Sequence, residues 1–252
     1  MIQKVAPAEH RRILLTIGTL GGGNHFLELD RDTEGNVWLI IHSGSRNLGL
    51  QVCRYHQNAA RRSIKETFQG AGAFHGMEYM PLKNGGEEYL KDMQIAQAYA
   101  EENRQTMAAI IIEGFFKKRP ANCKHISSTH NYVNFEDIII RKGAVSAHKD
   151  EMVIIPLNMR DGCLLAKGKG NEAWNCSAPH GAGRLLKRSE TKELISLEDY
   201  QKSMRGICSS CIRQDTIDES PMAYKDATEL LELIGETVEI VSEMKPVYSF
   251  KA

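Results

Sequence analysis

The chain has 252 residues, enough for one large domain or two small ones with a sizeable buried core. It carries 32 basic and 32 acidic residues, so the formal net charge is zero and a nucleic-acid partner needs a locally positive surface. With 42% hydrophobic and 25% charged residues, the composition excludes a disordered or fibrous protein.

The sequence gives no sign of a membrane or secreted protein. The longest apolar run, residues 108–116, contains Glu113 and is too short to span a bilayer. The N-terminal MIQKVAPAEHRR has no apolar signal region. The six cysteines are scattered along the chain, so we expect reduced thiols, a cytoplasmic location and no membrane partner.

The first predicted elements are two strands and a long helix. HFLELD (residues 25–30) and NVWLIIHSG (36–44) read as strands, joined by the hairpin-like turn DTEGN. Apolar residues then recur at spacings of three, four and seven, which predicts a helix from about Glu87 to Phe116. Gly85-Gly86 opens this helix, and the basic residues 117–119 close it.

Strands return in the second half of the chain. Residues 135–148 are predicted to fold back around Lys142-Gly143, and strands are expected at 151–158 and 163–168. A short helix is expected at 196–205, and a last helix from Pro221 toward Met244. Because strict βαβ alternation is absent, we predict an α+β fold in a single domain over residues 1–252.

Four histidines stand beside glycine or small polar residues at strand ends: His25, His42, His130 and His180. A single histidine is more often structural or exposed, but four in such settings indicate a shared pocket. Imidazole suits manganese, iron, zinc and copper alike, so the residue type does not select a metal. The other five histidines, such as His56, are expected on the surface.

The segment PHGAGR places His180 before a Gly-Ala-Gly turn. A neutral imidazole is a nucleophile toward phosphorus, and glycines allow a phosphate to approach the backbone. If a helix begins at the turn, Arg184 shares a helix face with His180 and its guanidinium suits phosphate. The alternative is a glycine-rich helix entry with a capping role, and the residues alone leave both interpretations open.

Three other short motifs give weaker evidence for a function. GTLGGGN lacks the ending of a P-loop, so alone it indicates a tight turn. HSGSR lacks the order Gly-x-Ser-x-Gly, which excludes a serine-hydrolase elbow. Cys208 and Cys211 form a CxxC without a second ligand pair, so we interpret them as two helix-terminal thiols rather than a zinc site.

Six separated motifs together resemble those of the RtcB RNA ligases. They are GTLGGGNHFLEL, HSGSRNLG, THNYV, PHGAGR, DESPMAYK and the terminal Lys251, in the family's order over nearly the whole chain. The resemblance implies a ligase that joins RNA ends with a 2′,3′-cyclic phosphate or 3′-phosphate to 5′-hydroxyl ends. It also implies GTP and Mn²⁺, with two ions in the complete family site, and a catalytic His180 that takes GMP.

The resemblance also assigns binding residues. It implies metal ligation by His25, His42 and His130, and contacts to substrate RNA by Arg46 and Arg184. Its guanylate-binding positions correspond to Asn24, His25, Phe26, Leu27, Glu28, His130, Asn131, Pro156, Leu157, Asn158, Met159, Cys163, His180, Gly181, Ala182, Gly183 and Lys251.

Two departures from the family pattern bear on these assignments. The sequence contains no Asp-x-Gly-Cys-Gly stretch, whose Asp and Cys also bind metal in the family, so a separate segment or subunit could supply them. The family's Pro-Gly-Ser-Met reads Pro156-Leu157-Asn158-Met159, and Cys163 replaces a serine. Two alternatives therefore stay open: a non-catalytic or split protein that binds RNA or nucleotide, and a metal-dependent cyclic phosphodiesterase.

Overall fold

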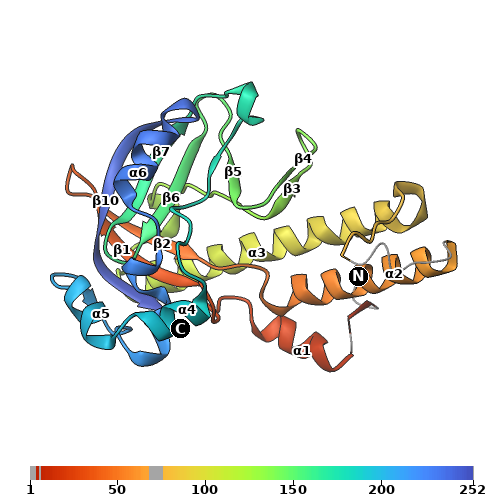
Figure 1. Ribbon diagram of the computed structural model, residues 1–252, viewed down its shortest axis with the longest axis horizontal. Helices are drawn as coiled ribbons and strands as arrows, with labels where there is room; N and C mark the ends of the chain where they lie inside the picture. The colour runs from red at the N-terminus through yellow and green to blue at the C-terminus, as the bar shows by residue number, and fades with distance from the viewer. Residues whose placement is uncertain (1–3, 6, 68–75, 252) are drawn as a thin grey trace. The chain divides into compact units, whose positions relative to one another are not determined.

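The computed structural model describes residues 4–5, 7–67 and 76–251 (Figure 1). The chain divides into two compact units, formed by residues 1–21 with 43–120 and by residues 22–42 with 121–252. Helices build the first unit, and a six-stranded sheet dominates the second. The predicted α+β class is therefore confirmed.

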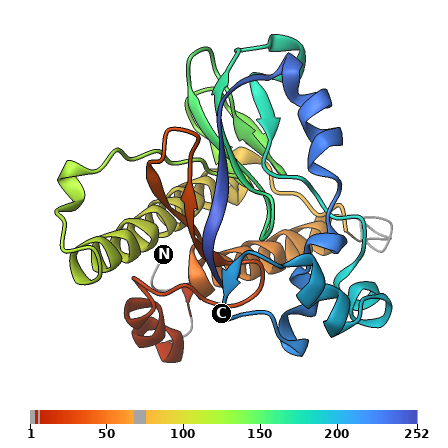
Figure 2. The same cartoon turned by 90° about the vertical axis from the view of Figure 1, so that its left-hand side faces the viewer.

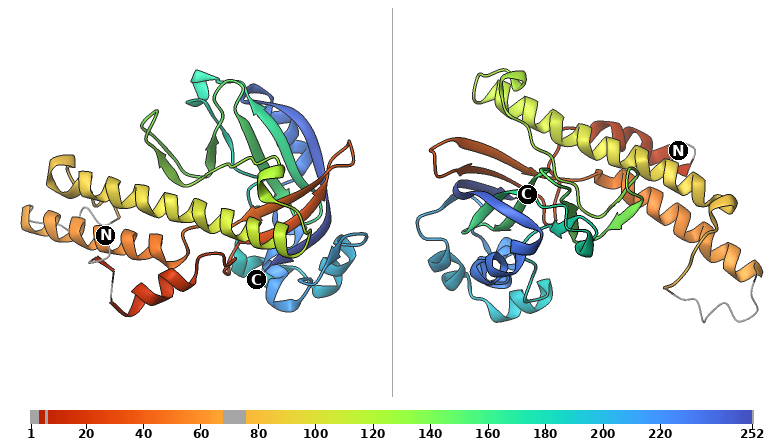
Figure 3. Two further views of the ribbon diagram at one scale, coloured as in Figure 1. Left: turned by 180° about the vertical axis from the view of Figure 1, so that it is seen from behind. Right: turned by 90° about the horizontal axis from the view of Figure 1, so that it is seen from above.

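The first unit is built around two long helices. Helix α2 (Arg46–Thr67) and helix α3 (Glu87–Gly114) lie side by side, with α1 (Pro7–Leu15) against α2 and the turn η3 (Leu82–Gly86) leading into α3 (Figure 3). The helix predicted at 87–116 is confirmed to within two residues. None of the described helices combines the length and apolar character needed to cross a bilayer.

Helix α2 is not anticipated by the sequence pattern, because its buried stripe is only partly apolar. The stripe uses every fourth residue: Leu48, Val52, His56, Ala60 and Ile64. The expectation of a surface position for His56 is wrong. This side chain is buried, with its Nε2 2.8 Å from Asp92 Oδ2, so a polar pair fills a core position of the helix.

Asn103 on α3 organises the loops of the first unit. The residue is fully buried; its amide donates to the carbonyl of Thr19 at 3.2 Å and to Ser43 Oγ at 3.1 Å, and its oxygen accepts from the Thr19 amide at 3.1 Å. One side chain thus provides buried partners for two separate loops.

We expect Asn103→Ala to lower the free energy of unfolding by about 1–3 kcal/mol, because it leaves buried polar groups of Thr19 without a partner. Urea denaturation measures the loss. Gln105→Ala, on the exposed face of the same helix, is the matched control and should change stability by no more than about 0.5 kcal/mol. Equal effects of the two substitutions would contradict this role of Asn103.

The sheet of the second unit is antiparallel along its main path. Its strand order is β2-β1-β10-β7-β6, and the short β9 (Cys208–Ser209) pairs with β10 in parallel. The strands on this path are β1 (Phe26–Arg31), β2 (Val37–His42), β6 (Met152–Asn158), β7 (Gly162–Gly168) and β10 (Val238–Lys251). The predicted hairpin of β1 and β2 and the strands at 151–158 and 163–168 are confirmed.

Strand β10 connects two ladders. Its first half pairs with β7 and its second half pairs with β1, so it runs through the middle of the sheet (Figure 2). The predicted helix from Pro221 to Met244 is therefore wrong beyond its first part. Helix α6 (Ala227–Leu233) and the turn η8 (Ile234–Glu236) end before Thr237. Gly235 weakens a helix, and the following Val-Glu-Ile-Val segment is rich in β-branched residues, which favour a strand.

The hairpin predicted around Lys142-Gly143 is also wrong. Strand β4 (Ile139–Arg141) pairs with β3 (Tyr132–Asn134), and β5 (Ala144–Ser146) pairs with β8 (Ser177–Pro179). Side-chain oxygens of Asn134 and Asp137 accept backbone N–H groups two residues ahead, at 3.0 Å each. These two Asx turns reverse the chain one strand earlier than the pattern predicts.

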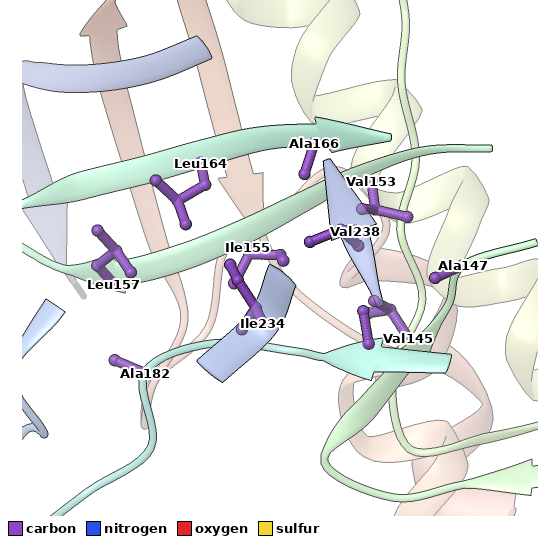
Figure 4. Close-up of a cluster of buried hydrophobic side chains, with 11 residues drawn as sticks. Val145, Ala147, Val153, Ile155, Leu157, Leu164, Ala166, Ala182, Ile234 and Val238 are labelled. Carbon is purple, nitrogen blue, oxygen red and sulfur yellow. The ribbon is translucent and has the colours of Figure 1, made fainter. Parts of the chain in front are cut away.

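The main core lies between β6, β7, α6 and the start of β10. Figure 4 shows its side chains gathered in one cluster, with Val153, Ile155 and Ala166 at 0% exposure. Full burial of one such aliphatic side chain contributes roughly 1.5–3 kcal/mol. The expected helix at 196–205 is confirmed as α5 (Leu197–Ser203), and the remaining elements are η4 (Pro120–Asn122), η5 (Glu172–Trp174), α4 (Arg188–Leu194), η6 (Gln214–Glu219) and η7 (Pro221–Ala223).

Candidate functional site

The sheet places three chemically different side chains in one row. Phe26 on β1 is the register partner of His42 on β2 and of Lys251 on β10. The Phe26 ring stacks on the His42 ring at 5.3 Å between centroids, and Lys251 Nζ lies 5.6 Å from the centre of the Phe26 ring. Strand pairing thus brings Lys251, near the end of the sequence, into one row with His42.

The four singled-out histidines form a continuous chain of ring contacts. His42 lies 5.9 Å from His25 and 5.2 Å from His130, and His130 lies 4.7 Å from His180, all between ring centroids. Burial, followed by the charges of neighbouring His130 and His25, lowers the pKa of His42 to about 3. His42 is therefore neutral at physiological pH, the form in which imidazole binds metals. The expected convergence of the four histidines is confirmed.

The ring of His180 is held in one tautomer. Its Nδ1 lies 2.7 Å from the carbonyl oxygen of Gly143, which only accepts hydrogen bonds, so Nδ1 carries the proton. The lone pair of the neutral ring is then on Nε2. Gly143 is itself held by Asn131, whose Oδ1 accepts the Gly143 N–H at 2.8 Å. Asn131 therefore acts on His180 through the backbone of Gly143.

The opposite wall is an ion-pair network around Glu219. This carboxylate is buried, accepts hydrogen bonds from Lys251 and, at 2.6 Å, from the Tyr224 hydroxyl, and forms an ion pair with Arg188. Burial alone would raise the pKa of Glu219, but Lys251, Tyr224 and Arg188 together outweigh burial, so the pKa is lowered. Burial lowers the pKa of Lys251 even though Glu219 opposes this shift. The geometry supports a charged Glu219–Lys251 pair, since the carboxylate has two hydrogen-bond donors and a second cation, Arg188, beside it.

Arg184 does not share a helix with His180, so that expectation is wrong. Helix α4 begins only at Arg188, and residues 180–187 are irregular. Arg184 Nε donates to the Leu186 carbonyl at 3.0 Å, and Nη2 donates to the Asp218 carbonyl at 2.6 Å and to Thr191 Oγ1 at 3.2 Å. These bonds engage both ends of the guanidinium and hold the loop after His180 against η6.

One pocket collects most of the predicted nucleotide positions. Its lining consists of Asn24, Phe26, Glu28, His42, Pro156, Leu157, Asn158, Met159, Gly162, His180, Gly181, Ala182, Gly183, Arg184, Arg188, Tyr224 and Lys251. His25 and His130 adjoin it through His42 and His180, and Asn131 through Gly143. Leu27 projects to the other face of β1, since neighbouring strand residues alternate. Arg46 lies in the other unit, where Nη1 donates to the Leu20 carbonyl at 2.9 Å.

Cys163 is not brought to this pocket. It is 1% exposed, packs with Ile40, Leu165 and Met244, and lies beside Asp30. The neighbouring Gly162 lines the pocket instead. Its φ is +81°, and a Cβ atom at this position would clash with the Met244 carbonyl, so the backbone here requires glycine.

We expect Cys163→Ser to leave the affinity for GTP or GMP unchanged, because the side chain is buried and does not line the pocket. Calorimetric titration with the nucleotide measures this affinity. Asn158→Ala, which changes a residue that lines the pocket, is the matched variant. Tighter nucleotide binding in Cys163→Ser would mean that residue 163 reaches the nucleotide after all.

His25, His42 and His130 do not form one compact set of three metal ligands. Among the described residues, the only group of three or more ligand-type side chains with donor atoms all within 4.8 Å is Glu28, Asp30 and Cys163. The three histidines do not meet that condition together, although adjacent rings are in contact. An ion held by a histidine pair therefore needs further ligands from elsewhere.

The sequence analysis assigned no role to three residues in or next to the pocket. Glu219 and Tyr224 lie within the quoted motif DESPMAYK but carried no assigned role, and Arg188 follows PHGAGR by four residues. Their common signal is a cluster of charged and phenolic residues next to the glycine turn. No local pattern indicates that Glu219 contacts Lys251, 32 positions later.

A pocket with an oriented histidine, a neighbouring neutral imidazole and a cationic wall is typical of proteins that bind phosphorylated ligands. The family model described as tRNA-splicing ligase RtcB matches residues 2–252, so the chain belongs to the RtcB family. The six-motif resemblance is thereby confirmed.

Curated relatives agree with this family. The chain is 33% identical to RNA-splicing ligase RtcB1 of one Escherichia coli strain and 32% identical to RNA-splicing ligase RtcB of Escherichia coli K12, in each case over 93% of the chain and 61% of the relative. It is 30% identical to tRNA-splicing ligase RtcB of Nanoarchaeum equitans, over 93% of the chain and 59% of the relative. The chain thus spans about three-fifths of these relatives' length.

Proposed function

We propose that this chain carries the guanylate-accepting site of an RNA ligase, with His180 as the nucleophile. The observation that carries the proposal is the His180–Gly143 hydrogen bond, which leaves Nε2 with a lone pair beside a pocket walled by Arg188 and Lys251. Family membership supports it, since the relatives are named as RNA-splicing and tRNA-splicing ligases.

Different residues of the chain have separate roles in such a reaction. Nε2 of His180 attacks the α-phosphorus of GTP, a nitrogen–phosphorus bond forms and pyrophosphate leaves. The GMP then passes to the 3′-phosphate of an RNA end, and a 5′-hydroxyl displaces it. Glycines 181 and 183 let the phosphate approach the backbone, and Glu28, Asn158 and Lys251 hold the nucleotide in the pocket.

Divalent metal, Mn²⁺ in our proposal, is held by His25, His42 and His130 together with ligands from outside these residues, and it supplies positive charge for the phosphates. The neutral His42 ring and the contacts between neighbouring rings support this assignment. A separate segment or subunit can supply such ligands. Free thiols at all six cysteines are compatible with a reducing, cytoplasmic setting.

Covalent labelling tests the proposal. We expect incubation with α-labelled GTP and Mn²⁺ to place a label on the protein that acid removes and base does not, as for a phosphoramidate. A label that base removes and acid does not would indicate another nucleophile. Binding of nucleotide without any label would favour the non-catalytic alternative.

A further inference from the structure

Two buried carboxyl groups and a thiol lie together beneath the pocket. Donor atoms of Glu28, Asp30 and Cys163 are all within 4.8 Å of one another, and the three side chains are 3%, 0% and 1% exposed. Glu28 and Asp30 follow one another on the same face of β1, and Cys163 projects from β7. Three separate chain positions thus converge on one buried point.

The polar groups of this cluster lack the partners that buried groups normally have. Neither carboxylate oxygen of Asp30 has a hydrogen-bond partner among the described residues outside Glu28 and Cys163. The hydroxyl of Ser249, directly across the ladder from Glu28 and therefore on the same face, is fully buried and has no partner in the described chain outside Glu28. Such groups are almost always satisfied by protein, water or an ion, so their convergence points to a role in binding a ligand.

The cluster also lacks a counter-charge. No described lysine or arginine forms an ion pair with Glu28 or Asp30, and the nearby Lys251 ammonium is bound to Glu219. Two carboxylates side by side in a buried site repel each other unless a cation or protons compensate them. A divalent cation satisfies the charge and the unpartnered oxygen atoms together.

We propose that Glu28, Asp30 and Cys163 form a binding site for a thiophilic divalent cation of the zinc type, chemically distinct from the histidine chain. Zinc binds carboxylate oxygen at about 2.0–2.2 Å and thiolate sulfur at about 2.3 Å, so donors this close can converge by small side-chain rotations. The thiolate selects Zn²⁺ or Cd²⁺ over Mg²⁺ or Ca²⁺. Glu28 also lines the pocket, which gives the ion a path to the site.

Cadmium titration of the 252-residue chain tests the site, because a Cd²⁺–thiolate bond has its own ultraviolet charge-transfer band. We expect one equivalent of Cd²⁺ to produce the band in the original protein, and Cys163→Ser to abolish it. Asp30→Asn, which keeps the shape and removes the charge, should weaken Cd²⁺ binding at least about tenfold. Thermal melting verifies that each variant is folded, and Asp30→Asn decides by calorimetry if Cys163→Ser does not fold.

Two matched variants distinguish this site from the alternatives. Cys211→Ser removes an equally buried thiol that bonds the Lys251 backbone rather than carboxylates, and it should retain the band. His42→Ala should also retain it, so the outcome is independent of the ligase proposal. A band that survives in Cys163→Ser, or that disappears only in Cys211→Ser, would overturn the assignment and point to the CxxC pair.

Discussion

Replacing His180 with alanine should abolish the covalent transfer of GMP from α-labelled GTP to this protein. The substitution removes the pocket-lining imidazole that is oriented by the Gly143 carbonyl and precedes the glycine turn. Because the nucleophile forms the bond itself, we expect loss of label to background rather than a partial decrease. Gel autoradiography after incubation with Mn²⁺ measures the effect.

Asn131→Ala should reduce labelling less than His180→Ala does, because Asn131 acts on the His180 ring only through Gly143. Without its side-chain oxygen, the Gly143 N–H loses its partner and the carbonyl that orients His180 becomes less fixed. We expect a lower labelling rate with the same final label, and Asn131→Asp, which keeps the acceptor, should restore the rate. Loss of nucleotide affinity without a change in rate would instead assign Asn131 to nucleotide contact.

His148→Ala is the matched histidine control for both variants. Its side chain is 48% exposed and bonds Asp137 at 3.1 Å, outside the pocket lining. Labelling should be unchanged in this variant. Label that survives in His180→Ala, or that disappears in His148→Ala, would show that the covalent bond forms at another residue.

Sequence patterns predicted those parts of the fold that depend on interactions between residues close in the sequence. The DTEGN turn fixes the β1–β2 hairpin because the Asp32 carboxylate accepts the N–H groups of Glu34 and Asn36, at 3.0 and 2.8 Å. Long amphipathic periodicity likewise identified α3. The histidines were recognisable because each follows or precedes glycine or small polar residues, a setting that a buried structural histidine such as His56 lacks.

Features that depend on distant partners were not predictable from one sequence. The segment after Gly235 becomes a strand because β1 and β7 both offer it unpaired edges, and this contact information is absent from residues 221–244 themselves. The same holds for Cys163: its sequence position suggested the pocket, but the side chain is buried beside Glu28 and Asp30 of β1, and Gly162 lines the pocket instead. The role of Glu219 likewise depends on a distant partner, Lys251 at the end of β10.

Replacing Glu219 with alanine should lower the free energy of unfolding by about 3–5 kcal/mol. The carboxylate is 3% exposed and neutralises the buried Lys251, so its removal leaves an uncompensated charge in the interior. Arg188 and the Tyr224 hydroxyl lose the same acceptor. Urea denaturation at neutral pH measures the loss, and Lys202→Ala, which breaks the exposed Glu198–Lys202 pair, should cost no more than about 1 kcal/mol.

A double variant separates the charge effect from lost packing. Lys251→Met combined with Glu219→Ala removes both buried charges, so it should be more stable than Glu219→Ala alone even though it carries one more substitution. The reason is that an unpaired buried ammonium costs more than an apolar side chain of similar length in the same place. If the two substitutions instead add their separate costs, Lys251 reaches water or another partner once Glu219 is gone. The stability of this wall would then come from packing and not from the ion pair.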